Sequence, residues 1–465
     1  MKYILTVDQS TSATKALLVD EQCRVCGRIS LPHAQHYPHA GWVEHDALEI
    51  LHNVRSCLET LCELVGRANI EAIALSNQRE TTVLWDAKTG EPLCPAIVWR
   101  DTRARALCDT LAGASEQVRQ ITGLTLSPYY PAAKAMYALQ AMGRTENVRI
   151  GTMDSFLIAS LCGRSVTDIS NAGRTELMNL RSCAWDEELL RLFGIRREML
   201  AEEILPSDSV FGTWQGIPIR GVMGDSHAAL YGHGCHTAGS AKATYGTGSS
   251  VMLNTGKEIR LVPGLQCCVG FADKDGVRYV QEGNVTCSGD TLVFLQDIGL
   301  FESAAQIEAE AAKAGNDGGM VLVPAFAGLG APYFAENARG LLCGMSRGAS
   351  RGQIAYAALS AVAQQNADVL EAMGGVESLH ADGGPTANRL LMQLQADLIG
   401  CDVRCTAESE MSAMGAAKMA GMATGFFPSF PVTASSGSYQ PACSAETRQE
   451  QRARWRQAVR RAMQA

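Results

Sequence analysis

The first twenty residues have the pattern of a β-hairpin with an unusually polar tip. Apolar runs at residues 3–7 and 16–19 flank the connection DQSTSATK, residues 8–15. The connection holds four hydroxyl groups, one carboxylate and one amine, and it has no bulky apolar side chain. Backbone N–H groups and side-chain oxygens at such a turn can face a phosphate, and a lysine adds positive charge. The hairpin is therefore a candidate phosphate-binding turn, with a solvated turn as the alternative.

Length and composition limit the class of protein. A chain of 465 residues, of which 46% are hydrophobic, is too long for a single hydrophobic core, so we expect at least two domains. A net charge of −8 argues against nucleic acid as a partner. The 16 cysteines are scattered, so we expect reduced thiols that pack as small apolar residues. No segment approaches the ~20 apolar residues of a membrane span, and the N-terminus does not resemble a signal peptide, so we expect a cytoplasmic protein without a membrane partner.

The order of elements predicts an α/β fold built twice. Asp46 begins a helix that ends near Gly66, and apolar strands are expected at 72–76, 81–85, 97–99 and 217–222. A strand, a small polar turn and a strand recur at 243–254, and a strand followed by a helix recurs at 378–388. The echo indicates two related domains with a cleft between them, joined by a hinge within 231–239.

Several polar residues stand at the ends of these predicted strands. Arg79 and Glu80 follow one strand and can bind ligand hydroxyls, although charged pairs there are most often a solvated edge. Asp225 follows another strand and precedes an alanine-rich helix, where it is either a ligand-facing carboxylate or a helix cap. Gly383 and Gly384 allow a flat ligand close to the backbone, or make a tight turn. Residues 168–175 are interpreted as a polar loop.

Together these stretches carry a family resemblance. GWVEHD at 41–46, NQRETT at 77–82 and VPAFAGLGAPY at 323–333 are specific in this order, and YGTG at 245–248 and DGGPTAN at 382–388 add to them. From residue 2 to about residue 463 the chain resembles the FGGY family of carbohydrate kinases and, within it, the glycerol kinases. The resemblance implies two actin-like, ribonuclease-H-like domains, 1–230 on the substrate and phosphate side and 231–465 on the adenosine side. It implies transfer of the γ-phosphoryl group of Mg-ATP to a hydroxyl of a small polyol or sugar, with glycerol as the leading acceptor.

The resemblance also implies roles for individual residues. Asp225 matches the catalytic base, and Asp8 matches the residue that holds Mg²⁺ through water. The acceptor contacts are Arg79, Glu80, Trp99, Tyr129, Asp225 and Ser226. The nucleotide contacts are Thr11, Ser12, Lys15, Thr247, Gly289, Gly384 and Asn388. Lys15 stands where the family usually has arginine.

Two departures from the family pattern leave the acceptor open. Ser226 replaces the usual glutamine after the base, and Ser250 replaces the aromatic residue just past YGTG. Both changes predict a roomier and wetter pocket, so a longer polyol or ketose (erythritol, a pentulose or a pentitol) competes with glycerol. The resemblance is also compatible with a homo-dimer or homo-tetramer.

Two other classes of protein agree less well with the sequence. A non-kinase actin-like ATPase is less consistent with the sequence, because it needs no small hydroxyl-binding cluster of Arg79, Glu80, Trp99 and Tyr129. A dinucleotide-dependent dehydrogenase is excluded by the first strand, which is not followed by a GxGxxG motif.

Overall fold

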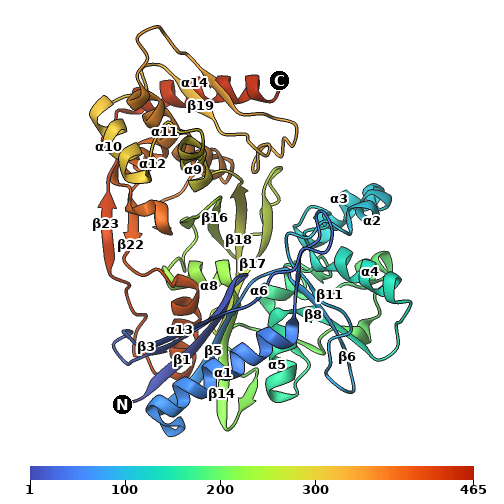
Figure 1. The fold of residues 1–465 in the computed structure, drawn as a ribbon. Coiled ribbons are helices and arrows are strands. Elements are labelled where there is room, and N and C mark those ends of the chain that lie inside the picture. Colours follow the sequence, from blue (N-terminus) through green and yellow to red (C-terminus); the bar gives the residue numbers. More distant parts are fainter. Residues whose placement is uncertain (465) are drawn as a thin grey trace.

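The computed structural model describes residues 1–464 and shows two sheets stacked along the long direction of the molecule (Figure 1). The first sheet has the strand order β13-β14-β5-β1-β2-β3 and the second has β17-β18-β16-β15-β21-β22-β23. The strands of the first sheet are β1 (Tyr3–Gln9), β2 (Ala13–Val19), β3 (Val25–Pro32), β5 (Ile70–Asn77), β13 (Gly212–Trp214) and β14 (Ile217–Gly224). Those of the second are β15 (Ser240–Tyr245), β16 (Ser249–Gly256), β17 (Gln266–Asp273), β18 (Gly276–Val285), β21 (Ser378–Asp382), β22 (Val403–Thr406) and β23 (Ser435–Tyr439).

The two sheets repeat one connectivity. In the first sheet β1 pairs antiparallel with β2 and parallel with β5, and β5 pairs parallel with β14. In the second, β15 pairs antiparallel with β16 and parallel with β21, and β21 pairs parallel with β22. The predicted echo of hairpin and strand is confirmed, and so is the α/β class with two related domains. The carboxyl ends of β1, β5 and β14 meet at one edge, where ligands of such sheets gather.

Sequence signals fixed the bounds of the first helix well. Helix α1 (Ala47–Val65) begins at Asp46, whose carboxylate accepts from the N–H groups of Leu48 and Glu49, and ends at Gly66, whose φ is 80°. Its apolar face packs on β1 and β2. Glu49 does not complete a capping box, because its carboxylate accepts from the backbone of Ala34 at 3.2 Å instead.

A lobe beside the first sheet carries part of the site. It holds a four-stranded sheet with the order β4-β7-β6-β8 and lies at the right of Figure 1. The strands are β4 (Glu44–His45), β6 (Thr82–Asp86), β7 (Ala96–Ile97) and β8 (Val148–Thr152), and the helices are α2 (Arg105–Thr110), α3 (Ser115–Thr122), α4 (Pro131–Met142), α5 (Met153–Cys162) and α7 (Glu187–Phe193). Short pairs link β9 (Val166–Asp168) with β12 (Glu203–Leu205) and β10 (Met178–Asn179) with β11 (Ala184–Trp185).

The polar segment 168–175 is not a loop. Asp168 ends β9 and caps α6 (Ile169–Ala172), where its carboxylate accepts from the N–H groups of Ser170 and Asn171. The segment is buried throughout. The prediction was wrong because a capped single helical turn can satisfy a run of small polar residues internally.

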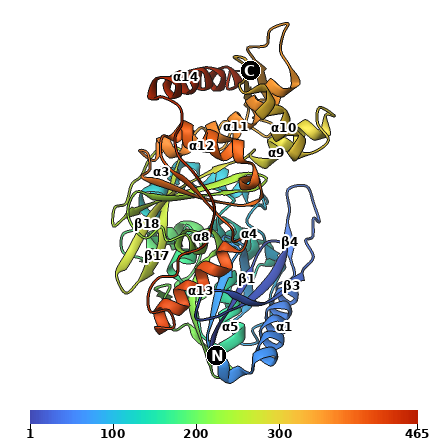
Figure 2. The same cartoon turned by 90° about the vertical axis from the view of Figure 1, so that its left-hand side faces the viewer.

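One helix from the second half of the sequence packs on the sheet of the first half. Helix α13 (Met411–Thr424) lies against β1, β5 and β14 of the first sheet, although in the chain it stands between β22 and β23 of the second sheet (Figures 1 and 2). It crosses α8 (Asp225–Gly232) so closely that a Cβ on Gly415 would lie 1.7 Å from the carbonyl oxygen of Ala228. The proposed division at 230/231 falls inside α8 and stays a prediction.

The outer end of the second half is helical. Helices α9 (Gly289–Asp297), α10 (Ala304–Ala314), α11 (Arg351–Ala372), α12 (Arg389–Ile399) and α14 (Ala445–Ala462) lie there with the strands β19 (Val321–Val323) and β20 (Leu341–Cys343) (Figure 2). Trp455 of α14 is 1% exposed and its Nε1 donates to Asp368 of α11 at 2.6 Å, so α14 packs against α11. Across residues 1–464, no helix combines the length and hydrophobicity needed to span a membrane.

Candidate functional site

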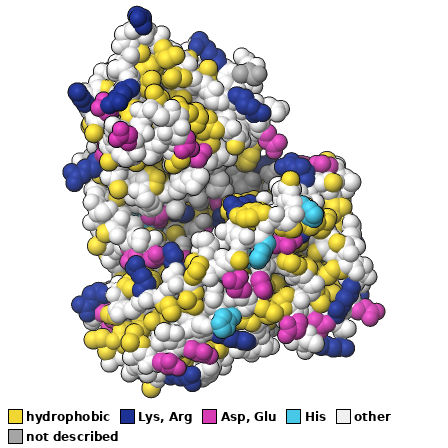
Figure 3. All heavy atoms as spheres, in the orientation of Figure 1, with side chains coloured by type: hydrophobic (Ala, Val, Ile, Leu, Met, Phe, Trp, Pro, Cys, Tyr) yellow, Lys and Arg dark blue, Asp and Glu magenta, His cyan; other side chains and the backbone are white. Residues whose placement is uncertain are grey.

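A cavity of about 600 Å³ opens between the side lobe and the second sheet. Figure 3 shows this face hollowed between the upper part of the molecule and the lobe at the lower right. Tyr129 and Arg174 line the cavity from the first half of the chain, and Glu282, Asn284 and Phe334 line it from the second. The cleft that the sequence predicted is therefore present, and one predicted acceptor contact lies in its wall.

A buried cluster of four charges lies beside this cavity. Arg79 donates to both carboxylate oxygens of Glu282 at 2.6 and 2.9 Å. Arg174 contacts Glu80 at 2.6 Å and Glu282 at 2.9 Å. None of the four side chains is more than 6% exposed. Because Glu282 lies on β18, the cluster joins the two halves of the chain.

The charges of this cluster balance one another. Burial alone would raise the pKa of Glu282, but Arg174 and Arg79 outweigh that effect and lower its pKa below the usual range. The same carboxylates hold the pKa of both guanidinium groups well above its usual value, against the opposing effect of burial. The predicted pair Arg79 and Glu80 is thus buried rather than a solvated edge, and Arg79, Arg174 and Glu282 remain charged in the buried site.

Asp225 stands at the start of α8, directly after β14. One oxygen accepts from the N–H of Ser226 at 2.6 Å and lies 3.5 Å from Nε of Arg79. The side chain is 35% exposed. Gly224, which has no side chain, holds the N-cap position, so Asp225 is the first residue of the helix and not its cap. The structure therefore leaves this carboxylate accessible next to the charged cluster.

Asp8 is the last residue but one of β1, and it lies close enough to Asp225 to be affected by its charge. It is 6% exposed, and its Oδ1 has no hydrogen-bond partner among the described residues. Burial and, second, the charge of Asp225 raise the pKa of Asp8 to about 7. Two neighbouring carboxylates fit a divalent cation between them, because the cation would neutralise both and give the buried oxygen of Asp8 a partner.

The hairpin tip and the acceptor residues are in direct contact. Nε1 of Trp99 donates to Oγ1 of Thr11 at 3.1 Å, and the rings of Trp99 and Tyr129 pack with centroids 5.7 Å apart. The tip itself, residues 10–12, is short, and Ser12 is exposed. The predicted phosphate residues and the predicted acceptor residues thus lie side by side.

Lys15 has a different partner from the one expected. Its Nζ contacts both carboxylate oxygens of Glu410, at 2.8 and 3.0 Å, immediately before α13. The pair is part-buried, with the lysine 34% exposed. The lysine therefore connects the hairpin to the start of α13 in this structure.

A second cavity is lined by the remaining residues that were predicted to contact the nucleotide. It measures about 650 Å³, and Thr247, Gly289, Gly384 and Asn388 all line it, together with apolar residues of α9. Gly383 has a φ of 96°, and a Cβ there would lie 1.9 Å from the carbonyl oxygen of Tyr245. The DGG turn therefore needs glycine because it packs on the backbone of the second hairpin.

Some residues of the site carried no assignment from sequence reasoning. Arg174 lies in the polar segment 168–175, and Glu282 lies in β18, a strand that also holds Arg278, Gln281 and Asn284, so neither charge stands out in its local sequence. Lys134 lies in the first turn of α4, where it resembles an ordinary helix residue. Burial of these charges depends on contacts between distant segments, which no local pattern reveals.

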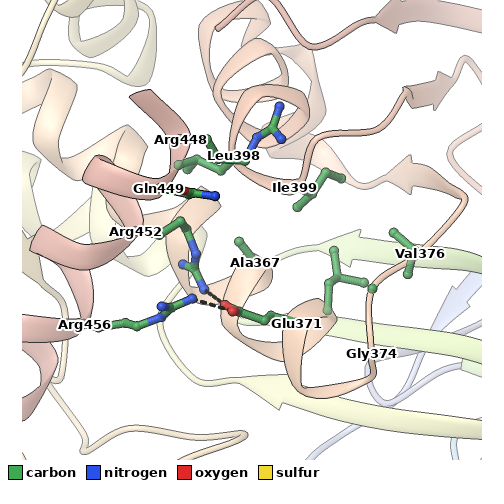
Figure 4. Close-up of a pocket in the computed structure, with 12 residues that line it drawn as sticks. Ala367, Glu371, Gly374, Val376, Leu398, Ile399, Arg448, Gln449, Arg452 and Arg456 are labelled. Atoms are coloured by element: carbon green, nitrogen blue, oxygen red, sulfur yellow. Dashed lines mark hydrogen bonds and ion pairs between the residues drawn. The ribbon is translucent and has the colours of Figure 1, made fainter. Parts of the chain in front are cut away.

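Another hollow, of about 450 Å³, lies between α11, α12 and α14 (Figure 4). Arg452 and Arg456 on its rim both contact Glu371, and Arg448 donates to the carbonyl oxygen of Asp397. None of the predicted site residues lines this hollow. Its charges are used within the fold, so the site is placed at the cleft.

Cleft, hairpin tip and paired carboxylates define a two-domain phosphotransferase. Family models for the N-terminal and C-terminal domains of the FGGY family of carbohydrate kinases match residues 3–232 and 241–424. The chain belongs to this family.

Relatives and solved structures agree with this assignment. The chain is 40% identical to a glycerol kinase of Aromatoleum aromaticum and 39% identical to glycerol kinase 1 of Thermotoga maritima, with 99% of each chain covered. The structure of Plasmodium falciparum glycerol kinase with ADP superposes with a TM-score of 0.94 at 29% identity, covering 99% of this chain and 98% of that one. The protein is a kinase that phosphorylates an alcohol group of a small polyol or sugar with a nucleotide as donor.

Proposed function

We propose that the acceptor is glycerol and that the donor is Mg-ATP. The observation that carries the proposal is the position of Asp225: its carboxylate lies 3.5 Å from Nε of Arg79, is 35% exposed, and is close enough to Asp8, beside the tip of the phosphate hairpin, to raise the pKa of Asp8. A hydroxyl bound there would have a proton acceptor on one side and the phosphate turn on the other. The relatives that match over their full length are glycerol kinases.

In this proposal the acceptor lies against the ring of Trp99, and Arg79, Glu80, Tyr129 and Ser226 bond its hydroxyls. The salt bridges of the charged cluster hold Arg79 and Glu80 in place before the substrate arrives. Asp225 accepts the proton as the hydroxyl oxygen attacks, which is the general-base assistance that phosphoryl transfer uses. Pre-set geometry of this kind supplies much of the catalysis of such reactions.

Asp8 would hold Mg²⁺ through water, since its buried Oδ1 has no hydrogen-bond partner within residues 1–464. When bound, the ion would neutralise phosphate charge. Thr11, Ser12 and Lys15 would contact the phosphates, which requires Lys15 to leave Glu410. In the second cavity, Thr247 and Gly289 would line the phosphate side of the nucleotide, and Gly384 and Asn388 would flank the adenosine.

Release of ADP from Mg-ATP tests the proposal directly. We expect the highest kcat/KM with glycerol in a panel that also holds dihydroxyacetone, erythritol, pentuloses and pentitols. A higher kcat/KM with a four- or five-carbon compound would contradict glycerol as the acceptor. ADP release that no member of the panel stimulates would contradict the proposal as a whole.

A further inference from the structure

Lys134 is a fully buried lysine just behind the acceptor residues. It lies in the first turn of α4, and it is 0% exposed. Its Nζ donates to the backbone carbonyl of Tyr129, and to that of Glu80 at 3.3 Å. Both carbonyls belong to residues whose side chains are proposed to bind the acceptor. One ammonium group therefore ties together two segments of the acceptor wall that are 49 residues apart in the chain.

The backbone of Glu80 needs such support. Its φ is 59°, in the left-handed region that residues other than glycine rarely occupy. Backbone of this kind persists at functional sites only where the surroundings hold it. Arg174 fixes the carboxylate of Glu80 at 2.6 Å, and Lys134 holds its carbonyl from the opposite end of the residue. The left-handed backbone conformation of Glu80 is thus held at both ends of the residue.

The charge of Lys134 is not used for an ion pair. Glu80, Asp101 and Glu176 lie near enough to favour its charged form, yet in the described chain none of them forms a salt bridge with it. Burial is the larger effect and lowers the pKa of Lys134 to about 7. A buried lysine is unfavourable unless its hydrogen bonds are used, and here they are used on the two carbonyls.

We propose that Lys134 is a positioning residue that sets the acceptor contacts of Glu80 and Tyr129 while leaving the nucleotide site unaffected. The inference rests on the proposed function, because it concerns the same acceptor site. It predicts that loss of the ammonium group raises KM for the acceptor without raising KM for ATP. A lysine with only a structural role would change stability, or change both constants together.

The test compares Lys134→Met with a matched control. Lys418 is also buried, at 1% exposure, and its Nζ also donates to a backbone carbonyl, that of Gly232 at 2.7 Å. In Lys134→Met we expect KM for glycerol to rise about tenfold or more, since small displacements of positioning groups have effects of this size, with KM for ATP within about twofold of wild type. In Lys418→Met both KM values should stay within about twofold of wild type.

Lys134→Gln keeps the test decisive if the methionine variant does not fold. The amide can still donate one hydrogen bond to a carbonyl, so the KM of Lys134→Gln for glycerol should lie between those of wild type and Lys134→Met. If Lys134→Met does not fold, the KM of Lys134→Gln for glycerol should still lie above that of wild type. An unchanged KM for glycerol in a folded variant, or a parallel rise of both KM values, would overturn the inference. Wild-type protein that is inactive with glycerol would instead overturn the proposed function.

Discussion

The indole N–H of Trp99 donates to the hydroxyl of Thr11 at 3.1 Å, so the proposed acceptor wall and the phosphate hairpin share a hydrogen bond. The two residues are 88 positions apart in the chain. Any movement of the hairpin on binding phosphates is therefore transmitted to the ring against which the acceptor lies.

Trp99→Phe removes this bond and keeps an aromatic wall. We expect kcat/KM for ATP and for glycerol to fall together, by about five- to tenfold, because a hydrogen bond of this kind contributes about 1 kcal/mol. Trp185→Phe is the matched control, since its Nε1 donates to the carbonyl of Ala201 at 2.9 Å, away from the cleft. A loss confined to one substrate would show that the bond does not couple the two sites.

Asp225→Asn should fold and bind nucleotide but lose turnover. The amide keeps the size of the side chain but is not a base, so we expect kcat to fall by about 10²- to 10⁴-fold. Glu188→Gln, which also removes a carboxylate from the first turn of a helix, should keep wild-type kcat. Steady-state ADP release and nucleotide titration measure the two properties. Near-normal kcat in Asp225→Asn would remove the assignment of the base.

Asp8 and Asp168 should each contribute stability to the ligand-free protein that is lost as the pH rises toward 7. Burial raises the pKa of Asp8 from 3.8 to about 7, and burial likewise raises that of Asp168 to about 7. In this window the folded protein keeps protons that the unfolded chain has lost, so the free energy of unfolding falls as pH rises. Denaturant unfolding across the window should show a smaller slope in Asp8→Asn and in Asp168→Asn than in wild type.

Mg²⁺ dependence should separate these two aspartates. Ionised Asp8 is the form that would hold the cation. As the pH rises toward 7, the apparent KM for Mg²⁺ should therefore fall by about tenfold per pH unit, and above pH 7 it should become constant. Asp8→Asn should lose this dependence, and Asp168→Asn should keep it because Asp168 caps α6. The same pH profile in Asp8→Asn and wild type would exclude Asp8 as the metal-holding group.

Gly415→Ala should destabilise the protein strongly. The added Cβ would lie 1.7 Å from the carbonyl oxygen of Ala228, in a contact that neither backbone can relieve without separating α13 from α8. We expect the free energy of unfolding to fall by about 3 kcal/mol or more. Gly113→Ala, where no atom lies within 4 Å of the added Cβ, should change it by less than about 0.5 kcal/mol. Denaturant unfolding of both variants measures the difference.

Local patterns predicted most of the fold. The hairpin of β1 and β2, the cap at Asp46 and the turn at Gly383 each have a short-range physical cause, and the structure shows all three. The polar run at 168–175 was misread because its hydrogen bonds are satisfied within a buried turn.

The site was predictable only where its residues lie at strand ends. Asp8, Arg79 and Asp225 occupy the carboxyl edge of one sheet, which a strand pattern can indicate. Glu282 and Lys134 act through contacts with segments far away in sequence, and so does the pairing of Lys15 with Glu410. The contacts of Glu282 and Lys15 depend on how the two halves pack, and that of Lys134 with Glu80 depends on packing within the first half. No residue pattern encodes either kind of packing locally.

Because α13 covers the first sheet, its late synthesis constrains the order in which the chain can fold on the ribosome. One face of the first sheet, including Ile4, Leu17 and Ala74, is covered by Ala413 and Ala417 of this helix. Strands β1 to β14 are complete by residue 224, but their cover is translated some two hundred residues later. Until then an apolar surface stays open to water, so the nascent chain should depend on a holdase, and C-terminal truncation should expose the N-terminal half to proteolysis.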